Sequence, residues 1–295
     1  MKRGFSSFHP LTCFLYYVGA LVIVMLGQHP AFLLSTVLVL IVFNIIQEKG
    51  GGLIRWWGAY ATLIIFFLVL TPLINHRGTH LLFYFRDNPV MLEAVIQGMI
   101  TGLSLLCLLL VFLSYNQIIT ADKFLFLFAR VLPQWALLTM LAMRFVPLFR
   151  RRLVEIDRVQ QSKGVSVKTG SLKQRIKNGL LFVQILLTWS LEEGIQTADS
   201  MKARGYGLKK RSRYTPYHFQ LKDGLLLVII ILFFSLSVAG WALGDLVLEI
   251  QPMLESPLLS GREWFFYVVG LLYMGIPLCI EGREWVLWRF WRYKI

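Results

Sequence analysis

Residues 92–115, "LEAVIQGMITGLSLLCLLLVFLSY", decide the fold of this chain, because one charged residue, Glu93, occurs in the whole run. An apolar stretch of about 20 residues is long enough to cross the hydrocarbon core of a bilayer as a helix. The stretch therefore predicts a transmembrane helix.

Apolar segments of the same kind recur along the chain. They are residues 11–27, 31–47, 56–75, 223–244 and 264–281. The composition agrees, since 57% of the 295 residues are hydrophobic and 16% are charged, against about 25% charged in a typical soluble domain. We predict an all-α integral membrane protein with about six transmembrane helices. Asn44 and Gln97 are the main polar residues within these segments, and each is predicted to hydrogen-bond to a neighbouring helix.

A basic region, residues 117–222, separates the fourth span from the fifth and carries 19 of the chain's 30 Lys and Arg residues. Loops rich in Lys and Arg remain in the cytoplasm, so we predict that both termini, including Lys2 and Arg3, are cytoplasmic. Arg77 and Arg86 run against this orientation. The predicted domains are residues 1–116 with transmembrane helices 1–4, a cytoplasmic helical domain at 117–222, residues 223–281 with helices 5–6, and a basic cytoplasmic tail at 282–295.

The basic region reads as four helices. Residues 120–131 form a short amphipathic helix, Pro133 begins a second, Pro147 breaks the pattern and begins a third, and Ser171 caps a long fourth that runs to Arg204. The fourth carries an apolar stripe at helical spacing. Its members are Ile176, Leu180, Val183, Leu187, Leu191, Ile195 and Ala198.

Two of these helices end alike, the third at Ser162-Lys163-Gly164 and the fourth at Ala203-Arg204-Gly205. Glycine just past a helix end readily takes the left-handed conformation, and a cation in the last turn is favoured by the helix dipole by about 0.3–1 kcal/mol. In the first interpretation, these ends are helix caps and nothing more. They also fit a second interpretation, in which each presents a basic side chain to a carboxylate of a partner.

Four segments of the chain resemble a known family. They are "FHPLTCFL" (8–15), "LPQWALLTMLAMRFVPLF" (132–149), "VQQSKGVSV" (159–167) and "ADSMKARGYG" (198–207). Together they are similar to the transmembrane T component of energy-coupling factor (ECF) transporters, the EcfT/CbiQ family. The second Ala-Arg-Gly motif of that family is complete here, whereas the first has Ser162 for Ala and Lys163 for Arg. Cys13 lies where a Lys is usual in the family.

The resemblance implies a scaffold and energy-coupling subunit of an ABC-class importer in the cell membrane of a prokaryote. Its implied partners are two cytoplasmic ABC ATPases, a membrane-embedded substrate-binding S component and the lipid membrane, and its implied cargo is a vitamin or a transition metal ion. It implies two long crossed coupling helices as well. The ATPase-coupling residues would be Ser162, Lys163, Gly164, Ala203, Arg204 and Gly205. The S component would contact Leu180, Val183, Leu187 and Leu191.

No phosphate-binding G-x-x-x-x-G-K-[S/T] loop occurs in the sequence, so ATP hydrolysis is expected in another chain. We expect no enzyme activity, no catalytic residues, no cofactor and no metal site. We also expect no nucleic-acid partner, because "KKRSR" (209–213) lacks interleaved stacking aromatics on a soluble domain. The alternative is a self-contained permease that binds substrate within its own spans, although the spans show no internal repeat.

Overall fold

The computed structural model describes residues 4–48, 51–75, 78, 80–85, 88–129, 131–208, 217–248 and 261–292. Several basic residues used in the sequence analysis lie outside this range. They are Lys2, Arg3, Arg77, Arg86 and the run 209–213. The chain divides into two compact units, one of Met1–Phe124 with Tyr217–Ile295 and the other of Leu125–Pro216.

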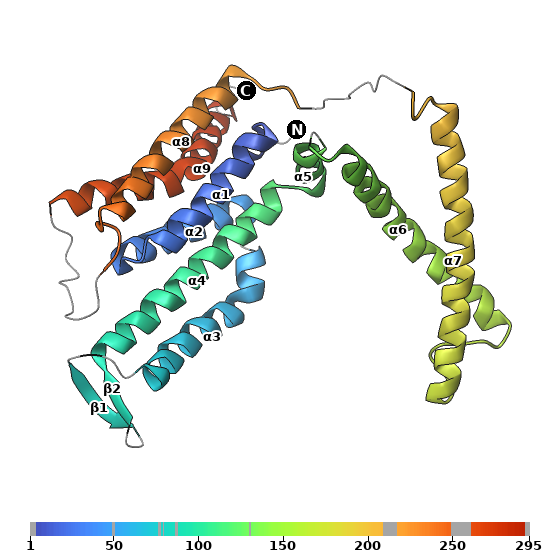
Figure 1. Cartoon of the computed structure of the whole chain (residues 1–295), viewed down its shortest axis with the longest axis horizontal. Coiled ribbons are helices and arrows are strands. Elements are labelled where there is room, and N and C mark those ends of the chain that lie inside the picture. Colours follow the sequence, from blue (N-terminus) through green and yellow to red (C-terminus); the bar gives the residue numbers. More distant parts are fainter. Residues whose placement is uncertain are drawn as a thin grey trace. The chain divides into compact units, whose positions relative to one another are not determined.

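Each predicted span of the first unit is a helix (Figure 1). After a short 3-10 turn η1 (Phe5–Ser7), the helices are α1 (Pro10–Leu26), α2 (Pro30–Glu48), α3 (Gly51–Ile74), α4 (Leu92–Ile118), α8 (Leu221–Ala242) and α9 (Arg262–Arg292). Five of them are long and apolar enough to cross a membrane, and α1 is a shorter apolar helix. The predicted all-α membrane fold is confirmed.

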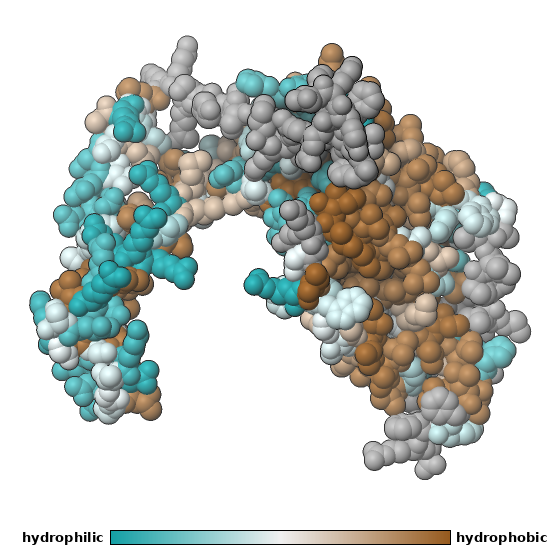
Figure 2. Space-filling model, turned by 180° about the vertical axis from the view of Figure 1, so that it is seen from behind, coloured by the Kyte–Doolittle hydropathy of each residue, from teal (hydrophilic) through white to brown (hydrophobic). Residues whose placement is uncertain are grey.

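Helix α4 packs against α1, α2 and α3, while α9 packs against α2 and α8. Two tyrosines tie α1 to α9, because the Tyr16 hydroxyl donates to the Met274 carbonyl at 3.2 Å and the Tyr273 hydroxyl donates to the Tyr16 carbonyl at 2.8 Å. Their rings also stack with centroids 5.2 Å apart. The face of this unit that Figure 2 shows is largely apolar, as a lipid-facing surface requires.

The two polar residues of the spans differ in their contacts. The Asn44 side-chain amide donates to the Leu40 carbonyl at 2.8 Å and to the Leu110 carbonyl of α4 at 3.3 Å, so its predicted interhelical bond is confirmed. The Gln97 side chain forms no hydrogen bond with any described residue, and the prediction for it is wrong.

An antiparallel hairpin precedes α4, formed by β1 (Leu81–Phe85) and β2 (Asn88–Met91), with Phe85 opposite Asn88. These two strands were not expected from the sequence. Just beyond the hairpin, the buried Glu93 carboxylate accepts hydrogen bonds from the backbone and the ring of His80, both at 3.0 Å.

The second unit consists mainly of two long helices, α6 (Pro133–Ser162) and α7 (Leu172–Ala203), which follow α5 (Ala121–Phe128) and cross each other (Figure 1). The prediction that Pro147 separates two helices is wrong, because Pro147 lies inside α6. An interior proline removes one backbone hydrogen bond and costs about 3 kcal/mol. Helix-forming residues on both sides, together with the packing of Phe149 against α7, offset that cost.

Gly240 allows α8 to approach α9 closely. A methyl group at this position would lie 2.6 Å from the Phe266 ring. We therefore expect Gly240→Ala to lower the melting temperature in detergent, since overpacking costs about 1–3 kcal/mol. Gly275→Ala in α9 is the matched control, because an added methyl there meets nothing within 4 Å. Equal melting temperatures for the two variants would contradict close packing at Gly240.

Candidate functional site: two helix ends and an apolar stripe

The end of α6 is closed by a pair of backbone hydrogen bonds. The Gly164 amide donates to the Gln161 carbonyl at 3.0 Å, and the Val165 amide donates to the Gln160 carbonyl at 2.9 Å. Gly164 has φ +79°, a left-handed conformation that glycine adopts without steric cost. This pattern is a Schellman motif, which satisfies carbonyls that would otherwise lack partners at the helix end.

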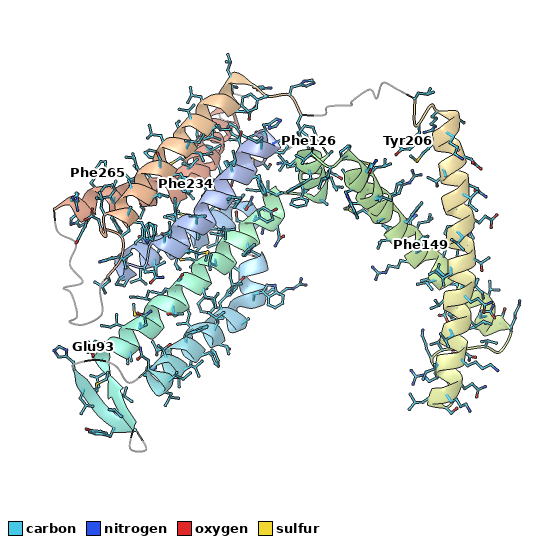
Figure 3. The ribbon with its side chains drawn as sticks, in the orientation of Figure 1. Glu93, Phe126, Phe149, Tyr206, Phe234 and Phe265 are labelled. Atoms are coloured by element: carbon cyan, nitrogen blue, oxygen red, sulfur yellow. The ribbon has the colours of Figure 1, made fainter. Side chains whose placement is uncertain are left out.

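The end of α7 repeats this arrangement. The Gly205 amide donates to the Lys202 carbonyl and the Tyr206 amide to the Met201 carbonyl, each at 2.9 Å, and Gly205 has φ +86°. Figure 3 shows Tyr206 directly beyond the last turn of α7. The predicted glycine-closed ends of both helices are therefore confirmed as local structure.

The cation before each glycine is held in nearly the same backbone conformation. Lys163 has φ −89° and ψ 6°, and Arg204 has φ −84° and ψ 6°. Both side chains are exposed, and neither forms a hydrogen bond or an ion pair with a described residue. The Ser162 hydroxyl turns back to the Val159 carbonyl at 2.8 Å, so it stabilises its own helix end. Each helix end thus presents a positive charge to the solvent at this position, and the last turn of α7 adds a second exposed cation, Lys202.

The two ends lie far apart within the second unit. The loop after α6 is fastened near the beginning of α7, where Asn178 donates to the Ser166 carbonyl at 2.7 Å and Arg175 donates to the Val167 carbonyl at 2.8 Å. From Asn178 to Arg204, α7 rises by about 39 Å at 1.5 Å per residue. The two cations therefore lie near opposite ends of α7.

One face of α7 packs against α6. The Trp189 ring lies edge-on to Phe149 with centroids 6.0 Å apart, and the Arg152 guanidinium lies 4.6 Å from the Trp189 centroid. Figure 3 shows Phe149 on α6 where the two helices cross. Arg152 also pairs with Glu155 at 2.6 Å. The contact of Phe149 and Arg152 with Trp189 therefore joins α6 to α7 between their two glycine-closed ends.

A different face of α7 is left uncovered. The four stripe residues that the resemblance assigned to the S-component contact are exposed: Leu180 by 65%, Val183 by 49%, Leu187 by 58% and Leu191 by 69%. Phe182, on the face turned toward the interior of the unit, is 7% exposed. A contiguous exposed apolar surface of this kind marks a site of contact with protein or lipid.

A polar connection at the start of the chain was not expected from the sequence. The buried Asp223 carboxylate accepts from the backbone amide of His9 at 2.8 Å and from that of Gln220 at 2.9 Å. Burial lowers the pKa of His9, although the charge of Asp223 acts in the opposite direction. The lowered pKa suits His9 as a cap, since its Nδ1 accepts from the Leu11 amide. Gln220 and Asp223 form a capping box, so their spacing could have revealed part of this connection.

No described group of three or more His, Cys, Asp or Glu side chains has an arrangement suited to a metal ion. The candidate functional features are therefore two exposed cations, which directly follow α6 and α7, and one apolar stripe on α7. Such a constellation is suited to contacts between proteins, because it offers charge at two points and apolar area between them.

Comparison with known proteins gives a consistent result. A family profile described as "Cobalt transport protein" (CbiQ) matches residues 6–215. The chain is similar to the "Energy-coupling factor transporter transmembrane protein EcfT" of Staphylococcus aureus, with 26% identity over 58% of this chain and 69% of that protein. It is also similar to the proteins of the same name in Bacillus selenitireducens and Brevibacillus brevis. The Bacillus selenitireducens protein is 32% identical over 37% of this chain and 41% of its own length. The Brevibacillus brevis protein is 30% identical over 36% of this chain and 40% of its own length.

The profile covers well over half of the chain, from η1 through α7, and includes both glycine-closed helix ends. Helices α8 and α9 follow the matched region. The resemblance read from the sequence is thereby confirmed, and this chain belongs to the CbiQ family, as a multi-pass transmembrane component of the energy-coupling factor transporter type.

Proposed function

We propose that the chain is the scaffold of an ECF-type ABC importer and transmits the motion of two cytoplasmic ATPases to a membrane-embedded S component. The observation that carries this proposal is the repeated helix end. At both Lys163 and Arg204, an exposed cation that pairs with no residue in the described part of the chain precedes a left-handed glycine. Two equivalent contact points near opposite ends of α7 suit two ATPase subunits, one at each end.

Each contact uses the same chemistry. A cation at a helix tip enters a groove on an ATPase and pairs there with a carboxylate, and the pair is shielded from water and salt. Arg204 forms the stronger contact because its planar guanidinium can donate two parallel hydrogen bonds to one carboxylate. Lys163 keeps the charge but lacks this geometry, so it forms the weaker contact.

Coupling follows from the crossing of α6 and α7. When ATP binding brings the two ATPases together, both helix ends move, and the packed contact of Phe149 with Trp189 transmits the motion to the stripe. The S component docks on Leu180, Val183, Leu187 and Leu191 and is tilted so that its vitamin or metal ion is released inward. An apolar surface without hydrogen bonds suits a partner that must slide and exchange.

In the proposed complex, the parts of the chain have the places that were predicted from the sequence. Residues 1–116 and 223–281 hold the membrane spans, residues 117–222 form the cytoplasmic coupling domain, and residues 282–295 form a basic tail on the same side as the amino terminus. ATP hydrolysis belongs to the ATPase chains, and this subunit acts through binding and motion alone.

Affinity purification of the tagged chain from its native membrane tests the proposal. We expect two nucleotide-binding subunits and one small membrane protein to be recovered with it. Recovery of the chain alone, together with binding of a small molecule to the isolated chain, would support a self-contained permease in place of the scaffold.

The shape of the second helix end is tested by Gly205→Val. Valine is β-branched and adopts φ +86° only with strain of about 1–3 kcal/mol, so the α7 end should reorganise although every charge is retained. We expect transport to fall at least fivefold in vesicles that contain the full transporter. Ser200→Val is the control, because it places the same β-branched residue at an exposed helical position in the last turns of α7, on the face opposite the stripe. Full transport by Gly205→Val would show that the tip needs no defined shape.

A further inference from the structure

A cavity of about 670 Å³ lies within the first unit, between the start of the chain, the beginning of α8 and the later turns of α9. In Figure 1 the beginning of α8 lies at the same end of the unit as the last turns of α9. The volume of the cavity is within the range of about 300–1,000 Å³ that is typical of ligand sites. The proposed coupling function makes no use of this cavity.

The lining of the cavity is divided into a basic part and an apolar part. Lys222, Arg283 and His218 supply the basic part. Lys222 and Arg283 are exposed and form no ion pair with any described residue. The apolar part includes Leu225 and Ile229 of α8.

The one acidic residue in the lining does not neutralise these cations by a direct contact. Both carboxylate oxygens of Asp223 accept hydrogen bonds from backbone amides, one from His9 and one from Gln220. Asp223 is 5% exposed, and its charge stabilises the backbone amides at the start of α8. The two neighbouring cations are left to attract an anion from outside the protein.

The apolar part of the cavity continues onto a surface that faces lipid. Leu225 lines the cavity and is 67% exposed, and Val228, one turn along the same membrane-spanning helix, is 62% exposed. An acyl chain can therefore lie along α8 while its headgroup occupies the basic part. A free phosphate ion would use the cations but would gain nothing from Leu225 and Ile229.

We propose that this cavity binds the headgroup of an anionic phospholipid, with the phosphate at Lys222 and Arg283 and an acyl chain along the apolar face of α8. Basic pockets between transmembrane helices are known to hold anionic headgroups. The bound lipid holds α8 and α9 together at this end of the unit. The inference rests on the membrane location and is independent of the coupling role.

Native mass spectrometry of the full chain in detergent, with added phosphatidylglycerol or phosphatidylcholine, tests the site. We expect wild-type protein to retain phosphatidylglycerol in preference to phosphatidylcholine. The double variant Lys222→Gln/Arg283→Gln should retain phosphatidylglycerol at least tenfold less well, since it lacks both cations that attract the headgroup. Because the whole chain has a net charge of +14, the matched control is Lys168→Gln/Lys173→Gln in the second unit. This control removes the same charge and should retain the lipid as wild type does.

Cys279 provides a second measurement that places the lipid in the cavity. It lines the cavity and is exposed, whereas Cys13 and Cys107 are buried. We expect phosphatidylglycerol, but not phosphatidylcholine, to slow maleimide labelling of Cys279 at least threefold, and the double variant to lose this protection. Unchanged labelling would overturn the proposal, as would equal retention of the two lipids. Equal protection by inorganic phosphate would show that the cavity is a site for free anions. An unchanged melting temperature of the double variant would show that its loss of lipid binding does not result from misfolding.

Discussion

Replacing Arg204 with glutamate should abolish recovery of the ATPase subunits with the tagged chain and reduce transport to background. Arg204 is exposed at the α7 tip and has no partner among the described residues, so the unit itself loses no internal contact. In the complex, the reversal replaces an attractive charge pair with a repulsive one. Loss of one partner of a buried charge pair costs about 2–5 kcal/mol, which corresponds to roughly a 30- to 4,000-fold loss of affinity.

Two comparisons separate this effect from a general change of charge. Arg150→Glu alters the net charge equally at an exposed position on α6, about 20 Å from Lys163 by helical rise, and should leave the complex intact. Arg204→Gln removes the pair without placing an anion at the helix C-terminus, where the dipole disfavours it. We expect Arg204→Gln to weaken ATPase recovery strongly and Lys163→Glu to be milder than Arg204→Glu. Undiminished uptake and full complex recovery with Arg204→Glu would contradict the coupling role.

The membrane spans could be predicted from the sequence because length and hydropathy alone determine them. The predicted segment 31–47 became α2 (Pro30–Glu48), and 223–244 became α8 (Leu221–Ala242). In lipid a helix must satisfy its own backbone hydrogen bonds, which leaves the chain few alternatives over an apolar stretch of this length.

The errors arose where a local rule competes with long-range packing. Pro147 predicts a helix break, since its local cost is about 3 kcal/mol. The sequence does not show that Phe149, two residues later, packs on Trp189 of another helix and so helps to hold α6 in place next to the proline. All five positions of the hairpin strand Leu81–Phe85 are aromatic or apolar, as is typical of a strand, but the strand is too short for periodicity to distinguish it from a loop.

The helix ends of the candidate site could be predicted because glycine and a preceding cation act over a few residues. The left-handed Gly164 and Gly205 follow from that local signal. The contact of His9 with Asp223 could not be predicted, since it joins residues more than 200 positions apart. Likewise, no sequence pattern shows that the Lys222 and Arg283 side chains line one cavity.

The stripe on α7 gives the second large prediction. Leu180→Asp/Leu187→Asp should eliminate recovery of the small membrane subunit while both ATPases are still recovered. The two side chains are 65% and 58% exposed, so the exchange costs the isolated unit little. In the complex it removes two buried apolar side chains, each worth about 1.5–3 kcal/mol, and places two carboxylates without partners in an apolar interface.

Thr188→Asp is the matched control, because it introduces a carboxylate next to Leu187 but about 100° around the helix. Its exposed position leaves the stripe intact, and we expect it to retain all partners. Loss of the ATPases together with the small subunit would indicate that the aspartates unfold α7, which circular dichroism of the purified variant would reveal. Recovery of the small subunit at wild-type levels by a folded double variant would exclude the stripe as its docking surface. The contact would then have to lie on the membrane spans, while Arg204 could still serve the ATPases, since the stripe and the tip occupy different parts of α7.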